Sequence, residues 1–256
     1  MKISVLIPSI RPRLLQGVYN SLEKSCNGIS FELVIISPYA LPESLSEKTN
    51  IIYIKDFGTP IRGRQMGLIA ATGDYICYAA DDVVFCENSL KEAYETLKGK
   101  DYKTLVVGKY MEGEVDNPAM QADSYWYLAT HDFLRPTIPA DKQGYFLINT
   151  GLISRELMLE VGGFDCSFEA CAMACCDLSV RLQNYGATCL LQNNAIFHAT
   201  HLPGERGDHK PINDGQTQHD MPKFLVMYLN NFNRTLIQLD NWRDASDHWV
   251  RRFGAK

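Results

Sequence analysis

The chain alternates short apolar runs with amphipathic segments over its first hundred residues, and this alternation limits the folds that it can adopt. Pro8 ends the first apolar run, and Pro12 opens a segment whose leucine and valine side chains share one helical face. A second helix is expected at 60–71, closed by Gly73. Short apolar strands separated by such helices are typical of a mainly parallel α/β sheet. The predicted strands lie at 3–7, 31–36, 50–54 and 75–79.

Two adjacent carboxylates, Asp81 and Asp82, follow the strand predicted at 75–79. In a parallel α/β sheet, ligands bind at the carboxyl ends of the strands. A desolvated acidic pair is costly without a partner, so we expect a divalent cation or a strong hydrogen-bond donor beside it. The alternative is a solvated loop in which Asp82 caps the segment that follows.

The composition bounds the class of protein. The 256 residues are 46% hydrophobic and 21% charged, as in an ordinary globular enzyme. A net charge of -5 without a run of Lys or Arg argues against nucleic acid as a partner. The first nine residues carry one Lys and a short apolar stretch, so we expect neither a signal peptide nor a membrane span, and predict a cytoplasmic protein. The eight cysteines fit a reducing compartment.

The segment 111–143 is rich in Asp, Pro and aromatic residues and lacks a clear periodicity. It follows a helix predicted at 89–97 and a strand predicted at 104–110. Such a segment predicts a long functional loop, or short helices, over a site. Four of its side chains either face a ligand or pack an irregular segment: Tyr125, Trp126, Tyr127 and His131.

Four short motifs occur in a fixed order along the chain. They are a first strand ending in Pro8, then Arg64-Gln65-Met66-Gly67 with Ala71-Thr72-Gly73, then Ala80-Asp81-Asp82, and finally Gly162-Gly163-Phe164-Asp165 followed by 177–182 and Gly186. Each motif alone is weak. In this order, and on compatible elements, they resemble glycosyltransferase family 2, of the GT-A fold, over roughly residues 1 to 200.

The resemblance implies an α/β fold: a GT-A-like, Rossmann-related three-layer sandwich with a mainly parallel central sheet. We expect a catalytic domain at 1–220 and a C-terminal helical extension at 221–256. Within the catalytic domain, 1–100 would be the nucleotide-sugar-binding half and 101–220 the acceptor-side half.

The resemblance also implies a metal-dependent, inverting glycosyltransferase. The donor would be a nucleotide-diphosphate sugar, UDP- or GDP-linked, and the acceptor a glycan, a lipid-linked or another hydroxyl. Asp82 would ligate Mn²⁺ or Mg²⁺, which neutralises the diphosphate. The family's first motif acid is Ala80 here, so we expect the ion to be held weakly, or only together with the diphosphate. The implied donor-binding residues are Pro8, Ser9, Arg11, Asp56, Arg64 and Asp81.

Histidines follow the strand predicted at 188–191, where members of the family often place one near the diphosphate. His198 is the first candidate for a second metal ligand, and His201 is the next. The polar loop 204–209 beside them is predicted to close over the donor. The alternative is that both histidines are structural.

The general base is where the chain departs most from the family. The aligned position is Cys175, and a thiol is a poor proton acceptor for sugar transfer. Asp177, two residues further on, is the first candidate for the base, and Glu169 is the second. The alternatives are that Asp177 pairs with Arg181 four residues later on an exposed helix face, or that activity is lost.

Three other interpretations stay open. A zinc site could use four clustered cysteines and the two histidines, although the spacing is not a recognised zinc motif and buried packing is favoured. A nucleotidyltransferase would carry a Gly-rich, Lys-containing phosphate loop, which the segment 9–12 lacks. A non-catalytic nucleotide-sugar-binding protein is favoured by Ala80 and Cys175. The clustered cysteines are Cys166, Cys171, Cys175 and Cys176.

The C-terminal segment 222–253 has helical spacing with an aromatic side. We expect it to pack back on the sheet or on a second copy of the chain, as a homodimer. Attachment to a membrane surface through Trp249 and its basic neighbours is the minority interpretation.

Overall fold

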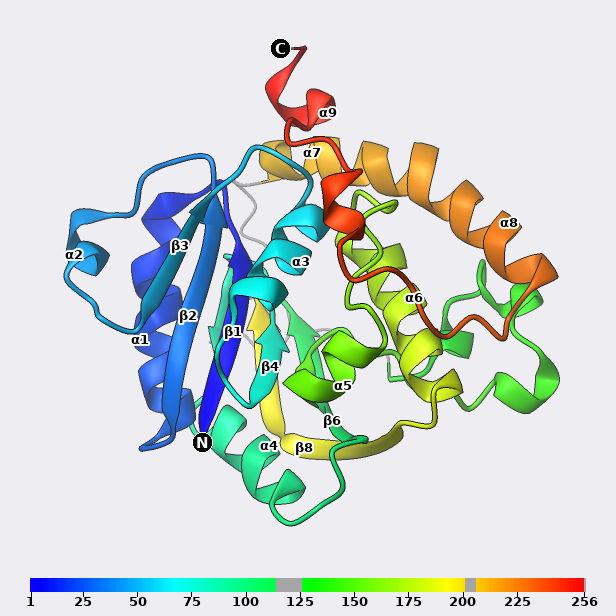
Figure 1. The fold of residues 1–256 in the computed structure, drawn as a ribbon, viewed down its shortest axis with the longest axis horizontal. Helices are drawn as coiled ribbons and strands as arrows, with labels where there is room; N and C mark the ends of the chain where they lie inside the picture. Colours follow the sequence, from blue (N-terminus) through cyan, green and yellow to red (C-terminus); the bar gives the residue numbers. More distant parts are fainter. Residues whose placement is uncertain (114–125, 201–205, 256) are drawn as a thin grey trace.

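The computed structural model describes residues 1–113, 126–200 and 206–255, in which eight strands form one sheet of order β3-β2-β1-β4-β7-β6-β8-β5 (Figure 1). The β1–β2, β2–β3, β1–β4 and β6–β8 pairs are parallel. The strand β7 runs antiparallel to β4 and β6, and β5 to β8. The predicted α/β fold with a mainly parallel sheet is confirmed. The strands are β1 (Lys2–Pro8), β2 (Ser30–Ser37), β3 (Ile51–Lys55), β4 (Tyr75–Tyr78), β5 (Val83–Phe85), β6 (Thr104–Glu112), β7 (Gly151–Ser154) and β8 (Thr188–Ala199).

Helices cover both faces of the sheet, because the strand side chains alternate between two hydrophobic clusters. In β1, Val5 packs in the cluster that contains Leu22 of α1 and Leu90 of α4. Its neighbour Leu6 packs in the opposite cluster, which contains Leu68 of α3 and residues of α5, α6 and α8. This arrangement gives the predicted three layers (Figure 1). The helices are α1 (Leu15–Cys26), α2 (Glu43–Ser46), α3 (Pro60–Ala70), α4 (Ser89–Leu97), α5 (Arg155–Glu160), α6 (Cys171–Asn184), α7 (Arg206–Gly215), α8 (Met221–Asn230) and α9 (Val250–Phe253).

The helix α3 lies unusually close to the sheet because two glycines face it. A Cβ added at Gly67 would lie 2.9 Å from Cδ1 of Ile36, and one at Gly63 would lie 3.2 Å from its Cγ2. Thr59 caps the helix, since its Oγ1 accepts a hydrogen bond from the backbone N–H of Arg62 at 3.1 Å. The close approach brings Arg64 under the carboxyl end of β4.

The strand β8 is longer than predicted and continues to Ala199, so His198 lies in a strand and not in a loop. The extension pairs with β6 through a register shift at Gly108/Lys109. A Cβ at Gly108 would lie 2.3 Å from the ring of Phe197, so a glycine is needed for this pairing. The polar residues 192–194 interrupt the apolar pattern of the strand, so local hydrophobicity does not predict the extension.

The irregular segments follow the predictions in part. Residues 126–143 form short 3₁₀ turns, whereas Tyr125 lies outside the described residues. The C-terminal extension is helical in α8 and α9, but is mostly irregular between them. The turns are η1 (Pro12–Leu14), η3 (Leu128–Thr130), η4 (Arg135–Thr137), η5 (Ala140–Lys142), η8 (Asn241–Arg243) and the π-helical η7 (Gln216–Asp220).

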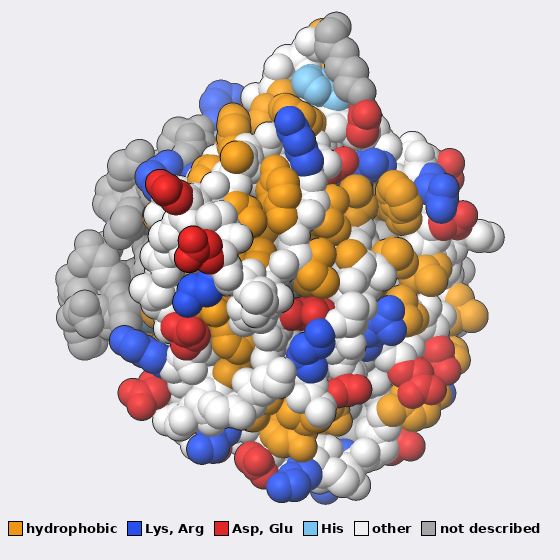
Figure 2. Space-filling model, turned by 60° about the vertical axis from the view of Figure 1, so that its left-hand side comes forward, with side chains coloured by type: hydrophobic (Ala, Val, Ile, Leu, Met, Phe, Trp, Pro, Cys, Tyr) orange, Lys and Arg blue, Asp and Glu red, His pale blue; other side chains and the backbone are white. Residues whose placement is uncertain are grey.

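The surface shown in Figure 2 mixes charges of both signs. Basic and acidic side chains are interspersed on this face, and hydrophobic side chains gather between them. That the protein does not bind nucleic acid stays a prediction from the sequence. Among the helices of the described segments, none combines the length and the hydropathy that a membrane crossing requires.

Candidate active site

A pocket of about 440 Å³ lies at the carboxyl ends of the central strands, and we call it the strand-end pocket. Its lining includes the turn 8–11 after β1, the turn 79–82 after β4, and residues of α3, β6, α6, α7 and the C-terminal segment. Ligands of α/β sheets bind at this edge, so the pocket is the candidate site. The structure brings every predicted donor-site residue to its wall, together with Asp82: Pro8, Ser9, Arg11, Asp56, Arg64 and Asp81.

The acidic pair is buried against Arg11. Asp81 accepts hydrogen bonds from Oγ of Ser9 at 2.7 Å, from the backbone N–H of Arg11 at 3.2 Å and from its Nε at 3.0 Å. Nη2 of Arg11 also contacts Asp81 and lies 3.1 Å from Oδ2 of Asp82. Burial acts to lower the pKa of Arg11, but the two carboxylates outweigh it and raise that pKa above its ordinary value. The alternative of a solvated loop is therefore wrong.

Arg64 is a buried cation on the pocket wall. It is 3% exposed, its Nη2 donates to the carbonyl of Ala79 at 3.2 Å, and its Nη1 lies 3.4 Å from Sγ of Cys175. The guanidinium carbon lies 4.9 Å from the ring centroid of Tyr78. Among the contacts of the described residues, Arg64 pairs with no carboxylate, and its Nε is without a hydrogen-bond partner. A buried cation of this kind favours an anionic ligand in the pocket.

Asp56 lines the pocket at the end of β3, and its carboxylate is held by two neighbours. It accepts from Nε of Arg62 at 3.2 Å and from the backbone N–H of Gly58 at 2.9 Å. Arg62 in turn donates to the carbonyls of Trp242 and Ala245 in the C-terminal segment. Asp56 therefore presents an oriented acceptor on the pocket wall.

Asp82 lies beside a histidine that the sequence did not single out as a ligand. Nε2 of His209, on α7, lies 3.6 Å from Oδ2 of Asp82, and the Asp82 side chain is 1% exposed. Two ligand atoms, each about 2.1 Å from one ion, lie about 3.0–3.6 Å apart at ordinary coordination angles. Within the described residues, no third His, Cys, Asp or Glu completes a metal-binding group with them. The oxygen and the imidazole nitrogen fit a two-ligand half-site for a divalent ion.

His198 does not reach this half-site. Phe197 lines the pocket, and alternation along β8 turns His198 to the other face, where it is 2% exposed. Burial lowers its pKa. The prediction that His198 ligates the ion is therefore wrong, because the His198 side chain does not line the pocket. His201, the second candidate, lies outside the described residues.

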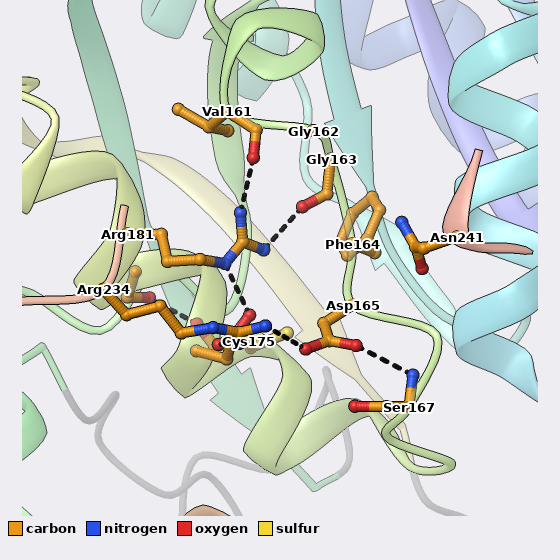
Figure 3. A network of polar contacts seen from close by, with 12 residues as sticks. Val161, Gly162, Gly163, Phe164, Asp165, Ser167, Cys175, Arg181, Arg234 and Asn241 are labelled. Carbon is orange, nitrogen blue, oxygen red and sulfur yellow. Dashed lines mark hydrogen bonds and ion pairs between the residues drawn. The ribbon is translucent and has the colours of Figure 1, made fainter. Parts of the chain in front are cut away.

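Asp177 does not line the pocket but lies in a buried ion network with Arg181 and Arg234, two residues that Figure 3 labels. Its carboxylate accepts from Nε of Arg181 at 2.7 Å and from the hydroxyl of Tyr228 at 2.6 Å, and it pairs with Nη1 of Arg234. Arg234 also bonds Asp165 at 2.6 Å. The Asp177 side chain is fully buried, so no acceptor hydroxyl can reach it. Its predicted role as the base is therefore wrong. The weighed alternative, a pair with Arg181, holds, although the pair is in the core and not exposed.

The glycine motif at 162–165 packs against α3, the helix that contains Arg64. Gly162 and Gly163 have φ angles of 85° and 71°, and a Cβ at Gly163 would lie 2.2 Å from Oε1 of Gln65. That oxygen accepts from the backbone N–H of Phe164 at 2.8 Å, and Nε2 of Gln65 donates to the carbonyl of Gly162 at 3.0 Å. Two of the sequence motifs are thus one packing unit, which holds α3 and Arg64 in place.

Glu169, the second candidate for the base, holds the C-terminal segment. It pairs with Arg251 and accepts from Nε1 of Trp249 at 3.2 Å. The backbone N–H of Trp249 donates to the carbonyl of Phe57 at 2.8 Å. Trp249 and Phe253 line the pocket, whereas Glu169 does not. The structure thus corrects the role of Glu169, which does not line the pocket but holds Trp249, a residue that does.

The clustered cysteines divide between the pocket and its surroundings. Cys171, Cys175 and Cys176 line the pocket, and Cys166 lies apart near Phe164. Burial raises the pKa of Cys175 to about 11, although Arg64 acts to lower it. The thiol is therefore protonated near neutral pH and is unsuited to accept a proton.

Three pocket residues on the side of β6 were missed as catalytic candidates. Tyr110 and Glu112 come from the end of β6, and His131 from the turn after η3. Burial, followed by the charge of Glu112, raises the pKa of Tyr110, which hydrogen-bonds to Glu112. Burial lowers the pKa of His131, so its imidazole is neutral near pH 7. The sequence left open whether His131 faces a ligand or packs an irregular segment, and no pattern in it singled out Glu112.

Comparison with solved structures finds a similar fold in S. aureus TarS. Its crystal structure matches 90% of this chain with a TM-score of 0.55 and 16% sequence identity. The structure of TarS 1–349 matches with a TM-score of 0.57 and 15% identity, and its complex with UDP with 0.55 and 15%. The match spans 43% of the first TarS chain and 71% of the shorter ones.

At this level of identity the likeness shows the fold, which is the GT-A-like α/β fold that the sequence predicted. A scan against protein families finds no match, and a search of curated proteins finds none either. Membership of family 2 therefore stays a prediction.

Proposed function

We propose that the strand-end pocket binds a nucleotide-diphosphate sugar, and that the chain is a family 2 type glycosyltransferase that moves the sugar to a hydroxyl acceptor. The observation that carries this proposal is Arg64, a buried cation on the pocket wall that pairs with no carboxylate among the described residues. A diphosphate supplies the missing negative charge. Asp81 and Asp82 stand on the same wall, where a ribose and an ion bind in the family that the chain resembles.

The donor base is proposed to be uracil, with guanine as the alternative. Asp56 offers a carboxylate that Arg62 and Gly58 orient, and such a group accepts an N–H from the edge of either base. The TarS fragment with a similar fold has been solved in complex with UDP, which favours uracil.

A divalent ion, Mn²⁺ or Mg²⁺, is proposed at Asp82 and His209, where it would offset the charge of the departing diphosphate. The distance of 3.6 Å between Oδ2 of Asp82 and Nε2 of His209 supports this pairing. The diphosphate oxygens would supply the remaining ligands, since Ala80 provides none.

For an inverting transfer, a base must accept the acceptor proton on the face opposite the diphosphate. Neither Asp177 nor Glu169 lines the pocket. Among the described lining residues, Glu112 and His131 are proposed to accept this proton. His131 is neutral near pH 7 because burial lowers its pKa. The acceptor, the cytoplasmic location and a homodimer through the C-terminal segment stay predictions.

The test is the release of nucleotide diphosphate from a panel of UDP- and GDP-sugars with Mn²⁺ or Mg²⁺. We expect metal-dependent turnover that Asp82→Asn abolishes and that the exposed control Asp240→Asn leaves intact. Glu112→Gln and His131→Asn identify the base, since its removal costs about 10²–10⁴ in rate. No turnover with any donor would refute the transferase proposal.

A non-catalytic nucleotide-sugar-binding protein is the second candidate. It is favoured by Cys175, whose thiol cannot serve as the base at the aligned position. Tight binding of a nucleotide sugar without release of nucleotide, under all the metals tested, would support it over the transferase.

A further inference from the structure

Arg11 and the proposed ion site share one oxygen atom. Nη2 of Arg11 lies 3.1 Å from Oδ2 of Asp82, and Nε2 of His209 lies 3.6 Å from that same oxygen. An ion bound by Asp82 and His209 would therefore stand a few ångströms from the guanidinium. A divalent cation and a guanidinium repel each other at such a separation, and the repulsion is strong because the side chains are buried. Arg11 and Asp82 are only 7% and 1% exposed.

The contacts of Arg11 are unequal on the two carboxylates. Asp81 receives its backbone N–H, its Nε and its Nη2, and is held further by Oγ of Ser9 at 2.7 Å. Ser9 in turn accepts from the backbone N–H of Arg11 at 3.1 Å. The contact with Asp82 is made by the outer nitrogen Nη2. Two contacts of Arg11 with Asp81, through the backbone N–H and Nε, do not involve the nitrogen that contacts Asp82.

The charges favour joint binding of ion and diphosphate. Asp81 and Asp82 carry two negative charges, Arg11 already offsets one of them, and Ala80 adds none. A divalent ion that arrives alone therefore competes with Arg11 for Asp82. A diphosphate brings negative oxygens that both the ion and Arg11 can bind, so it removes the competition.

We propose that Arg11 is an internal counter-ion for Asp82, which keeps the divalent-ion site closed until a nucleotide diphosphate arrives. The ion and the donor then bind together, not the ion first. This inference rests on the proposed function, because it assigns a cation site to Asp82. It goes beyond that function by naming the residue that sets the order of binding.

The test measures Mn²⁺ binding directly, from the loss of the free Mn²⁺ signal in electron paramagnetic resonance. The probes are Mn²⁺ alone and Mn²⁺ with UDP or GDP. We expect the wild type to bind Mn²⁺ at least tenfold more tightly when the nucleotide is present. We expect Arg11→Met, which keeps an apolar stem and removes the charge, to bind Mn²⁺ alone at least tenfold more tightly than the wild type. Arg13→Met, which removes the charge of an exposed arginine two residues away, should behave as the wild type.

The inference is overturned if the wild type binds Mn²⁺ equally well with and without a nucleotide that it binds, or if Arg11→Met binds Mn²⁺ no more tightly. Should Arg11→Met fail to fold, as circular dichroism would show, Arg11→Gln takes its place and the wild-type comparison decides independently. Failure of the proposed function looks different. In that case neither UDP nor GDP binds the wild type, while the Mn²⁺-only comparison of variants still decides the role of Arg11.

Discussion

Replacing Asp177 with asparagine separates a structural role from a catalytic one. The Asp177 carboxylate is fully buried and bonds Arg181 at 2.7 Å, the Tyr228 hydroxyl at 2.6 Å, and Arg234. The neutral amide would leave the buried guanidinium of Arg181 without its countercharge. Removing one partner of a buried ion pair costs about 3–5 kcal/mol. At about 2–4 °C per kcal/mol for a chain of this size, the melting temperature should fall by roughly 6–20 °C.

The assay is thermal and urea unfolding of Asp177→Asn followed by circular dichroism. The matched control is Asp240→Asn, since Asp240 is 67% exposed and only 4.0 Å from its partner Arg243. The control should melt with the wild type. Turnover of Asp177→Asn, measured well below its melting transition, should stay near the wild-type rate. A variant that melts with the wild type but has lost turnover would refute the structural role and restore Asp177 as the base.

Three further predictions follow from the pocket and the sheet. Glu169→Gln should raise KM for the donor more than it lowers kcat, because it loosens the wall formed by Trp249; steady-state kinetics that show a loss of kcat alone would instead support a base. Cys175→Ser should keep most of the turnover, since the thiol pKa of about 11 leaves it protonated, whereas a loss of about a hundredfold or more in the same assay would contradict this. Glu32→Gln should lower the melting temperature at pH 7. Burial acts to raise the pKa of Glu32, but hydrogen bonds from Lys2, Ser4 and Thr72 outweigh it and lower the pKa to about 2 from 4.5. The stabilisation is thus complete above about pH 4.5 and is lost as pH falls towards 2. Melting curves in which the difference from the wild type is the same at pH 3 as at pH 7 would count against this assignment.

The sheet could be predicted because its signals are local. The strands β1 to β4 are apolar runs bounded by Pro, Gly or polar turns, and the acidic pair stands directly after one of them. The donor-side residues follow from the same logic, since the carboxyl ends of parallel strands meet at one edge. The long extension of β8 could not be read in this way, because its pairing depends on the space that Gly108 leaves for Phe197.

The roles of the acceptor-side residues could not be predicted, because these residues are positioned by contacts with residues far away in the sequence. Asp177 has the sequence of an exposed helical ion pair, and only Tyr228 and Arg234, more than fifty residues later, show that this helix face is buried. His209 likewise reaches Asp82 through the packing of α7, which no local pattern specifies. No feature of the sequence around Glu169 distinguishes a structural role from that of a base. The structural role depends on the ion pair with Arg251, which lies far away in the sequence.

The central claim is that the strand-end pocket is a nucleotide-diphosphate site, and a thermal-shift panel tests it most directly. UDP, GDP, ADP and their sugars would be titrated with Mn²⁺ into the wild type and into Asp82→Asn, because a ligand that binds the native state raises the melting temperature. We predict that one base, with uracil favoured, raises the melting temperature of the wild type, and that the rise is greatly reduced in Asp82→Asn. If no nucleotide diphosphate stabilises the wild type, or if the variant responds as strongly, the claim is contradicted.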